Sequence, residues 1–221
     1  MSIPIVPAII PTSEAEVVQM TKTLRFSHEL HLDVVDGKFV PAVSWPFTPV
    51  GEPIAVKPHT DAYTLEVDLM VDNPIPVAKQ WIQAGADMVV FHIETVDLAS
   101  FIDFIDHAPK SVSIGASFSG DTLLDAVFPY LEHADYIQVM GIHAIGVQGQ
   151  PFDEAVFAKI EAIRTTFPQL MISVDGSVNL QTAPRLVKAG VDRLIVGSAI
   201  VKQDDPEAAY HALVKVVNEA R

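Results

Sequence analysis

Short apolar runs alternate with amphipathic stretches along the whole chain, and this alternation constrains the fold more than any other feature. The apolar runs have the length of strands, and each is followed by a segment with helical periodicity. Alternating strands and helices predict a parallel sheet, because each helix returns the chain to the start of the next strand. The predicted strands are 3–10, 29–35, 62–71, 86–93, 111–118, 134–142, 170–176 and 191–198.

A helix is expected after each of these strands. The second helix is poorly marked, because the second strand is followed by a loop rich in proline and aromatic residues, 39–53. The other helices are predicted after Thr12 or Ser13, over 75–84, behind the fourth strand, and over 121–132, 153–166, 179–189 and 205–220. Eight βα units in 221 residues predict an α/β fold, a (β/α)8 TIM barrel that forms a single domain over 1–221. A doubly wound sheet is the alternative.

The charge balance excludes some classes of partner. The chain has 28 acidic residues against 14 Lys and Arg, a net charge of -14, so we expect no nucleic-acid binding. A phosphate ligand would have to be held mainly by backbone N–H groups and helix ends. The absence of cysteine excludes disulfides and thiolate nucleophiles, and it fits a cytoplasmic protein. We expect neither a signal peptide nor a membrane span, because the apolar runs are short and the first is broken by prolines.

Polar residues gather where the predicted strands end, which is where a (β/α)8 barrel carries its active site. His31 and Asp33 are two residues apart, so they share one face of their strand. Buried carboxylates are costly unless they are paired or bind a cation, so several of them converging on one barrel mouth indicate a metal or proton-transfer chemistry. The same pair could also be a histidine at a strand edge and an aspartate that starts a turn. The strand-end residues are His31, Asp33, Asp36, Asp68, His92, Glu94, Met140, His143, Asp175, Gly197 and Ser198.

Five short motifs occur in a fixed order: HLDVVDGKFVP, LMVDNP, FHIE, VDGS and VGSAI. In order and separation they resemble the ribulose-phosphate 3-epimerase family, over essentially the whole chain. The resemblance implies a (β/α)8 barrel and an isomerase that interconverts D-ribulose 5-phosphate and D-xylulose 5-phosphate with one divalent metal. It implies that Asp33 and Asp175 are the two proton-transfer groups, and that His31 binds the metal together with them.

The resemblance also implies how the phosphate is held. Backbone amides of the loops after the sixth, seventh and eighth strands would bind it, and the corresponding residues are Gly146, Gly149, Gly176, Ser177, Gly197 and Ser198. This arrangement suits an acidic chain, because amides rather than lysines would meet the anion. The expected partners are therefore a small sugar phosphate and, as in the family, further copies of the chain in a dimer or hexamer.

Three positions depart from the family pattern. Asp68 stands where the family has a metal-binding His, and Pro11 stands where the first strand ends with Ser. The sixth loop, 140–150, is one residue longer and lacks tandem glycines. We expect Asp68 to be the fourth metal ligand, which gives one imidazole and three carboxylates. Such an oxygen-rich set favours Mn²⁺ or Mg²⁺ over Zn²⁺, with Fe²⁺ also open.

Several alternatives stay open. His92 is an alternative ligand, Met140 is a possible site residue, and His143 in the altered loop either contacts substrate or is solvated. The function could be epimerisation of another ketose phosphate. A sugar-phosphate lyase or decarboxylase on the same barrel is less favoured, because related enzymes often carry a D-x-K-x-x-D pattern that is absent. A non-catalytic sugar-phosphate binder would explain Asp68 but not the retention of both proposed acid–base residues.

Overall fold

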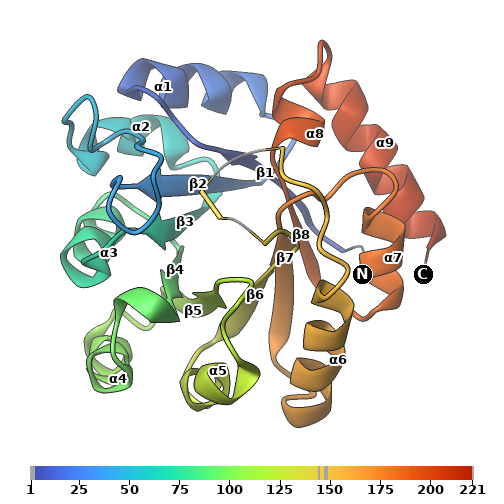
Figure 1. The fold of residues 1–221 in the computed structure, drawn as a ribbon. Helices are drawn as coiled ribbons and strands as arrows, with labels where there is room; N and C mark the ends of the chain where they lie inside the picture. Colours follow the sequence, from blue (N-terminus) through green and yellow to red (C-terminus); the bar gives the residue numbers. More distant parts are fainter. Residues whose placement is uncertain (1–2, 144, 147–148, 221) are drawn as a thin grey trace.

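The strands close into a barrel in the computed structural model, which describes residues 3–143, 145–146 and 149–220 (Figure 1). The strands are parallel and follow one another in chain order, and β8 is hydrogen-bonded to β1. The predicted (β/α)8 barrel is confirmed. The doubly wound alternative is wrong, because an open sheet leaves its edge strands unpaired. The strands are β1 (Ile5–Ile9), β2 (Glu29–Val35), β3 (Thr64–Met70), β4 (Met88–His92), β5 (Ser113–Phe118), β6 (Tyr136–Met140), β7 (Met171–Asp175) and β8 (Arg193–Val196).

The helices surround the barrel (Figure 1). After β2 the chain forms a short 3-10 helix, Pro53–Val56, that leads into α2 (Lys57–Thr60), because the proline-rich loop takes up the length that a longer helix would need. No helix within the described residues is long and apolar enough to cross a membrane. The other helices are α1 (Glu14–Thr23), α3 (Pro74–Gln83), the 3-10 helix Ile93–Thr95, α4 (Leu98–His107), α5 (Leu124–Leu131), α6 (Val156–Thr166), α7 (Ala183–Lys188), α8 (Ser198–Val201) and α9 (Pro206–Glu219).

The two faces of the strands differ sharply in polarity. Side chains alternate along a strand, so on β2 the residues Leu30, Leu32 and Val34 pack in the core shared with the helices. The alternate positions of the strands carry many polar side chains, which are nonetheless buried. They are His31, Asp33, Glu66, Asp68, His92, Ser117, Gln138, Ser173 and Arg193. Because the interior of such a barrel is usually filled by branched apolar residues, this polar interior marks the site.

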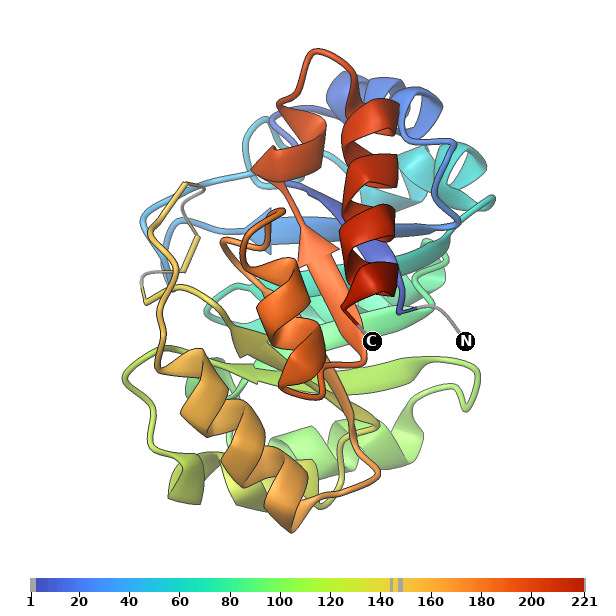
Figure 2. The same cartoon turned by 90° about the vertical axis from the view of Figure 1, so that its right-hand side faces the viewer.

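An apolar cluster covers one end of this interior, and we call it the mouth cluster. It consists of Val35, Val40, Met70, Met140, Ile142 and Ile145. The loops after β2 and β6 lie at the same end of the barrel (Figure 2), and they meet where Gly146 approaches Val40 so closely that a Cβ would collide with it. Apolar side chains of both loops therefore cover part of the carboxyl end of the barrel.

Candidate active site

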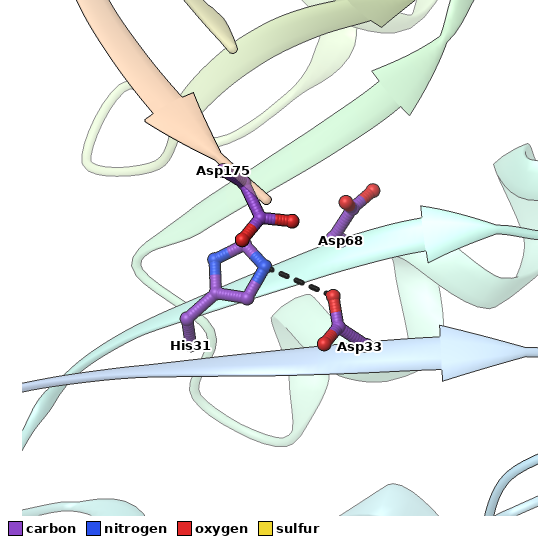
Figure 3. A group of neighbouring side chains, drawn as sticks. All are labelled: His31, Asp33, Asp68 and Asp175. Atoms are coloured by element: carbon purple, nitrogen blue, oxygen red, sulfur yellow. Dashed lines mark hydrogen bonds and ion pairs between the residues drawn. The ribbon is translucent and has the colours of Figure 1, made fainter. Parts of the chain in front are cut away.

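Four side chains on the inner face converge at the carboxyl end of the barrel. The register pairs Asp33 on β2 with Asp68 on β3, His31 lies two residues before Asp33, and Asp175 ends β7. Each offers one ligand atom, and these atoms lie within 4.8 Å of one another (Figure 3). One imidazole nitrogen and three carboxylate oxygens at this spacing fit a single divalent cation. The structure thus brings together the four residues that the sequence nominated as metal ligands.

His31 is oriented by a buried ion pair with Glu66. Its Nδ1 atom lies 2.7 Å from Oε2 of Glu66, and its Nε2 atom lies 3.2 Å from Oδ1 of Asp33. Glu66 also accepts a 2.5 Å hydrogen bond from Nη1 of Arg193, whose Nε donates to Glu29 at 2.9 Å. A carboxylate on Nδ1 fixes the ring orientation and leaves Nε2 facing the other three side chains.

Asp68 is held through both of its carboxylate oxygens. Nε2 of His92 lies 3.0 Å from Oδ1, and Nε2 of Gln138 lies 2.8 Å from Oδ2. His92, which the sequence left open as a ligand, therefore contacts the carboxylate of Asp68 and is not one of the four clustered side chains. Gln138 and Glu66 were not predicted as site residues, although the period of two in L-E-V-D places Glu66 on the face of Asp68.

Burial and the neighbouring charges together leave the pKa values of Asp33, Asp175 and His31 raised, so these groups tend to be protonated in the metal-free cluster. Burial raises the pKa of Asp175 to about 8, and the nearby charge of Asp33 adds to this shift. The pKa of Asp33 is also raised, because its burial outweighs the hydrogen bond from His31. Desolvation opposes the charging of His31, but Glu66 and Asp33 outweigh it, so its pKa lies well above 6.5. A bound cation would take the place of these protons.

A cavity opens beside the cluster. Asp33, Asp175 and Met140 line it, and so do all six residues that the resemblance assigned to phosphate binding: Gly146, Gly149, Gly176, Ser177, Gly197 and Ser198. None of the described lining residues is Lys or Arg. Within the sixth loop, Ala144, Val147 and Gln148 lie outside the described residues.

One part of the cavity wall has an unusual backbone. Gly176 and Ser177 follow each other in the left-handed region, with φ of 97° and 52°. A serine in this region is uncommon and is typical of ligand-binding or catalytic segments. The hydroxyl of Ser177 donates to the carbonyl of Gln150, so the loop after β7 is tied to the loop after β6.

At the altered end of the first strand and in the altered sixth loop, the structure shows contacts that the sequence did not predict. Ala8 and Ile10 line the cavity near the end of β1. Pro11 accepts a 2.8 Å hydrogen bond from the N–H of Trp45 and so anchors the loop after β2. His143 is largely exposed, with Nε2 3.4 Å from Asp121, and it is not among the described residues that line the cavity.

Solved structures share the fold. A 3-hexulose-6-phosphate synthase from Salmonella typhimurium superposes with a TM-score of 0.74 at 18% identity, covering 100% of both chains. A 3-keto-L-gulonate-6-phosphate decarboxylase from Vibrio cholerae gives a TM-score of 0.71 at 12% identity, also covering 100% of both chains. At such identities the likeness concerns the barrel alone.

Sequence comparison is more specific. The model of the "Ribulose-phosphate 3 epimerase family" matches residues 4–201. A ribulose-phosphate 3-epimerase of Mycobacterium tuberculosis is 32% identical over 213 residues, 95% of this chain and 90% of the relative. The Schizosaccharomyces pombe enzyme of the same name is 31% identical, over 94% and 89% of the two chains. The expected enzyme class, an isomerase, is thereby confirmed, and the chain belongs to the ribulose-phosphate 3-epimerase family.

Proposed function

We propose that the protein is a metal-dependent sugar-phosphate 3-epimerase that interconverts D-ribulose 5-phosphate and D-xylulose 5-phosphate. The observation that carries the proposal is the pair of carboxyl groups, Asp33 on β2 and Asp175 on β7, which line one cavity and both have a raised pKa. Family membership supports the choice of a pentose phosphate.

The chemistry requires two acid–base groups. One carboxylate removes the proton on C3, next to the ketone, and the other carboxyl group returns a proton from the opposite face, which inverts C3. A carboxyl group whose pKa is raised in the metal-free protein takes up a proton readily, and its ionised form is the stronger base that removal of the C3 proton needs. When bound, a divalent cation would stabilise the negative charge that develops on the enediolate oxygens.

Further residues of this chain support binding and exclusion of water. We assign the phosphate to the backbone N–H groups of the segments 176–177 and 197–198 and of the sixth loop, at the usual phosphate site near the seventh and eighth strands of such barrels. The mouth cluster keeps water away from the carboxyl groups and so strengthens the electrostatic interactions there. The three carboxylates favour Mn²⁺ or Mg²⁺ over Zn²⁺.

The cellular setting is part of the proposal. A rice relative, 32% identical over 85% of this chain, is named a cytoplasmic isoform, and the chain has no cysteine. We therefore assign the protein to the cytoplasm, and we expect it to form dimers or hexamers as the family does.

The decisive experiment is proton exchange at C3. The protein is incubated with D-ribulose 5-phosphate in D₂O, with and without Mn²⁺, and C3 is followed by NMR. We expect deuterium at C3 together with the appearance of xylulose 5-phosphate, and both should depend on the metal. Absence of exchange with Mn²⁺, Mg²⁺, Fe²⁺ or Zn²⁺ would refute the proposal and would favour another ketose phosphate or a binder.

Two variants identify the acid–base residues. In Asp33→Asn and Asp175→Asn we expect turnover to fall by at least about 100-fold, as for loss of a general acid or base. Binding of inorganic phosphate should change little in both. Product formation that survives both substitutions would contradict the assignment, and release of an aldehyde from D-ribulose 5-phosphate would indicate the lyase.

A further inference from the structure

The carboxylate of Asp68 is hydrogen-bonded by two side chains that come from distant parts of the chain. His92 lies on β4 and Gln138 on β6, and each is fully buried and bonds a different oxygen of Asp68. Neither is one of the four clustered side chains. These contacts fix the rotation of the carboxylate about its own axis, which a single hydrogen bond would leave free.

These two hydrogen bonds are compatible with metal binding by Asp68. An ionised carboxylate has about four lone-pair directions, two on each oxygen. His92 and Gln138 occupy one direction on each oxygen, at 3.0 and 2.8 Å, so each oxygen keeps a second direction for a cation. Two N–H donors also spread part of the negative charge that three neighbouring carboxylates concentrate in one place.

The strand between the two donors leaves them room to reach Asp68. β5 separates β4 from β6, and its residue Ser117 is in register with both His92 and Gln138. Serine is small, and Gly115 lies two residues earlier, where a Cβ would collide with the ring of Tyr136. The His92 ring is further supported by Phe39, whose ring centre lies 5.3 Å away.

We infer that His92 and Gln138 are positioning residues that aim the carboxylate of Asp68 at the metal and thereby set the affinity of this altered site for Mn²⁺. The inference rests on the proposed metal-dependent function. His92 and Gln138 thus share one role, and the orientation of the Asp68 carboxylate depends on both of them. Side chains that orient a ligand from behind commonly change metal affinity by about 10- to 100-fold.

The test measures Mn²⁺ binding directly, without substrate. The dissociation constant is determined from the electron paramagnetic resonance signal of free Mn²⁺ for the wild type, Gln138→Leu and His92→Phe. We expect each variant to bind Mn²⁺ about 10- to 100-fold more weakly. His92→Gln, which keeps an N–H donor, should recover part of the loss. Ser117→Ala is the matched control, because it changes the same layer of the barrel without touching Asp68, and it should bind Mn²⁺ like the wild type.

The measured Kd values distinguish failure of this inference from failure of the proposed metal centre. If Gln138→Leu and His92→Phe both bind Mn²⁺ as tightly as the wild type, the inference is wrong while the metal centre stands. If the wild type itself binds neither Mn²⁺ nor Zn²⁺, the metal centre of the proposed function fails, and the inference fails with it. Circular dichroism of each variant shows whether it is folded, and Gln138→Leu decides the question if His92→Phe does not fold.

Discussion

Replacing Arg193 by Met should destabilise the protein strongly, because the buried carboxylate of Glu66 loses its main counter-ion. The Arg193 side chain is 3% exposed, and its guanidinium bonds the fully buried Glu66 at 2.5 Å and Glu29 at 2.9 Å. Removing one partner of a buried ion pair costs about 3–5 kcal/mol, and Glu66 would keep only His31 as a counter-charge. For a chain of this length the loss corresponds to a fall in Tm of roughly 6–20 °C.

The stabilisation should also depend on pH with a definite sign. Burial alone would raise the pKa of Glu66, but Arg193 and His31 lower it well below its usual value of 4.5. A carboxyl group with a lowered pKa stabilises the fold above 4.5, and this contribution is lost as the pH falls from there toward the lowered value. The difference between the wild type and Arg193→Met should therefore be complete at pH 7 and shrink in acid.

Urea denaturation followed by circular dichroism measures these free energies. The double variant Arg193→Met/Glu66→Gln should be more stable than Arg193→Met alone, because an uncharged amide needs no counter-ion and can still accept from Nδ1 of His31. The control is Arg185→Met, which breaks an exposed pair with Glu154 and should cost less than about 1 kcal/mol. A loss below about 1 kcal/mol in Arg193→Met, or no recovery in the double variant, would refute the reasoning.

The proposed metal site yields three further predictions. Because the pKa of His31 lies well above 6.5 and that of Asp175 is about 8, binding of Mn²⁺ at pH 7 should release roughly one to two protons, and the affinity for Mn²⁺ should rise as the pH rises through about 8. Calorimetry in buffers of different ionisation heat counts the protons released. Because the pKa of Asp175 is raised, its contribution to the stability of the metal-free fold is complete below pH 3.8 and is lost as the pH rises through about 8. Above pH 8, Asp175→Asn should therefore have a higher Tm than the wild type when both are metal-free, and an equal Tm would contradict this prediction. Asp68→His should shift the preference from Mn²⁺ toward Zn²⁺, which competition binding measures as a changed ratio of the two Kd values.

The architecture was predictable because its signal is repeated. Each strand carries apolar residues that face the helices, and eight such runs separated by helical segments lead to a closed barrel. Boundaries were less predictable: the strand expected over 134–142 is β6, Tyr136–Met140, because the apolar residues Ile142 and Ile145 belong to the mouth cluster. Apolar residues that cover the mouth look like a strand continuation in the sequence alone.

The clustered side chains were predictable for a similar reason. His31, Asp33, Asp68 and Asp175 lie at or near strand ends, and parallel strands bring their ends to one place. The residues that contact these four side chains from behind were not predictable, because their contacts cross the barrel. Gln138 lies 70 residues from Asp68 in the chain, and Arg193 lies 127 residues from Glu66. Alternation predicts which side chains face inward, but it does not predict which of them meet.

An aspartate in place of the expected histidine changes more than one ligand. It adds a negative charge to a buried cluster that already holds Asp33 and Asp175, so the change is tolerable only if donors or protons compensate it. The structure has both kinds of compensation: Asp175 retains a proton at neutral pH, and His92 and Gln138 donate to Asp68. The cluster therefore accommodates its third carboxylate through contacts that compensate the added charge. This organisation predicts that Asp68→Asn, which removes the charge but keeps the shape, weakens Mn²⁺ binding more than Ser117→Ala does, and calorimetric titration of the two variants measures that difference.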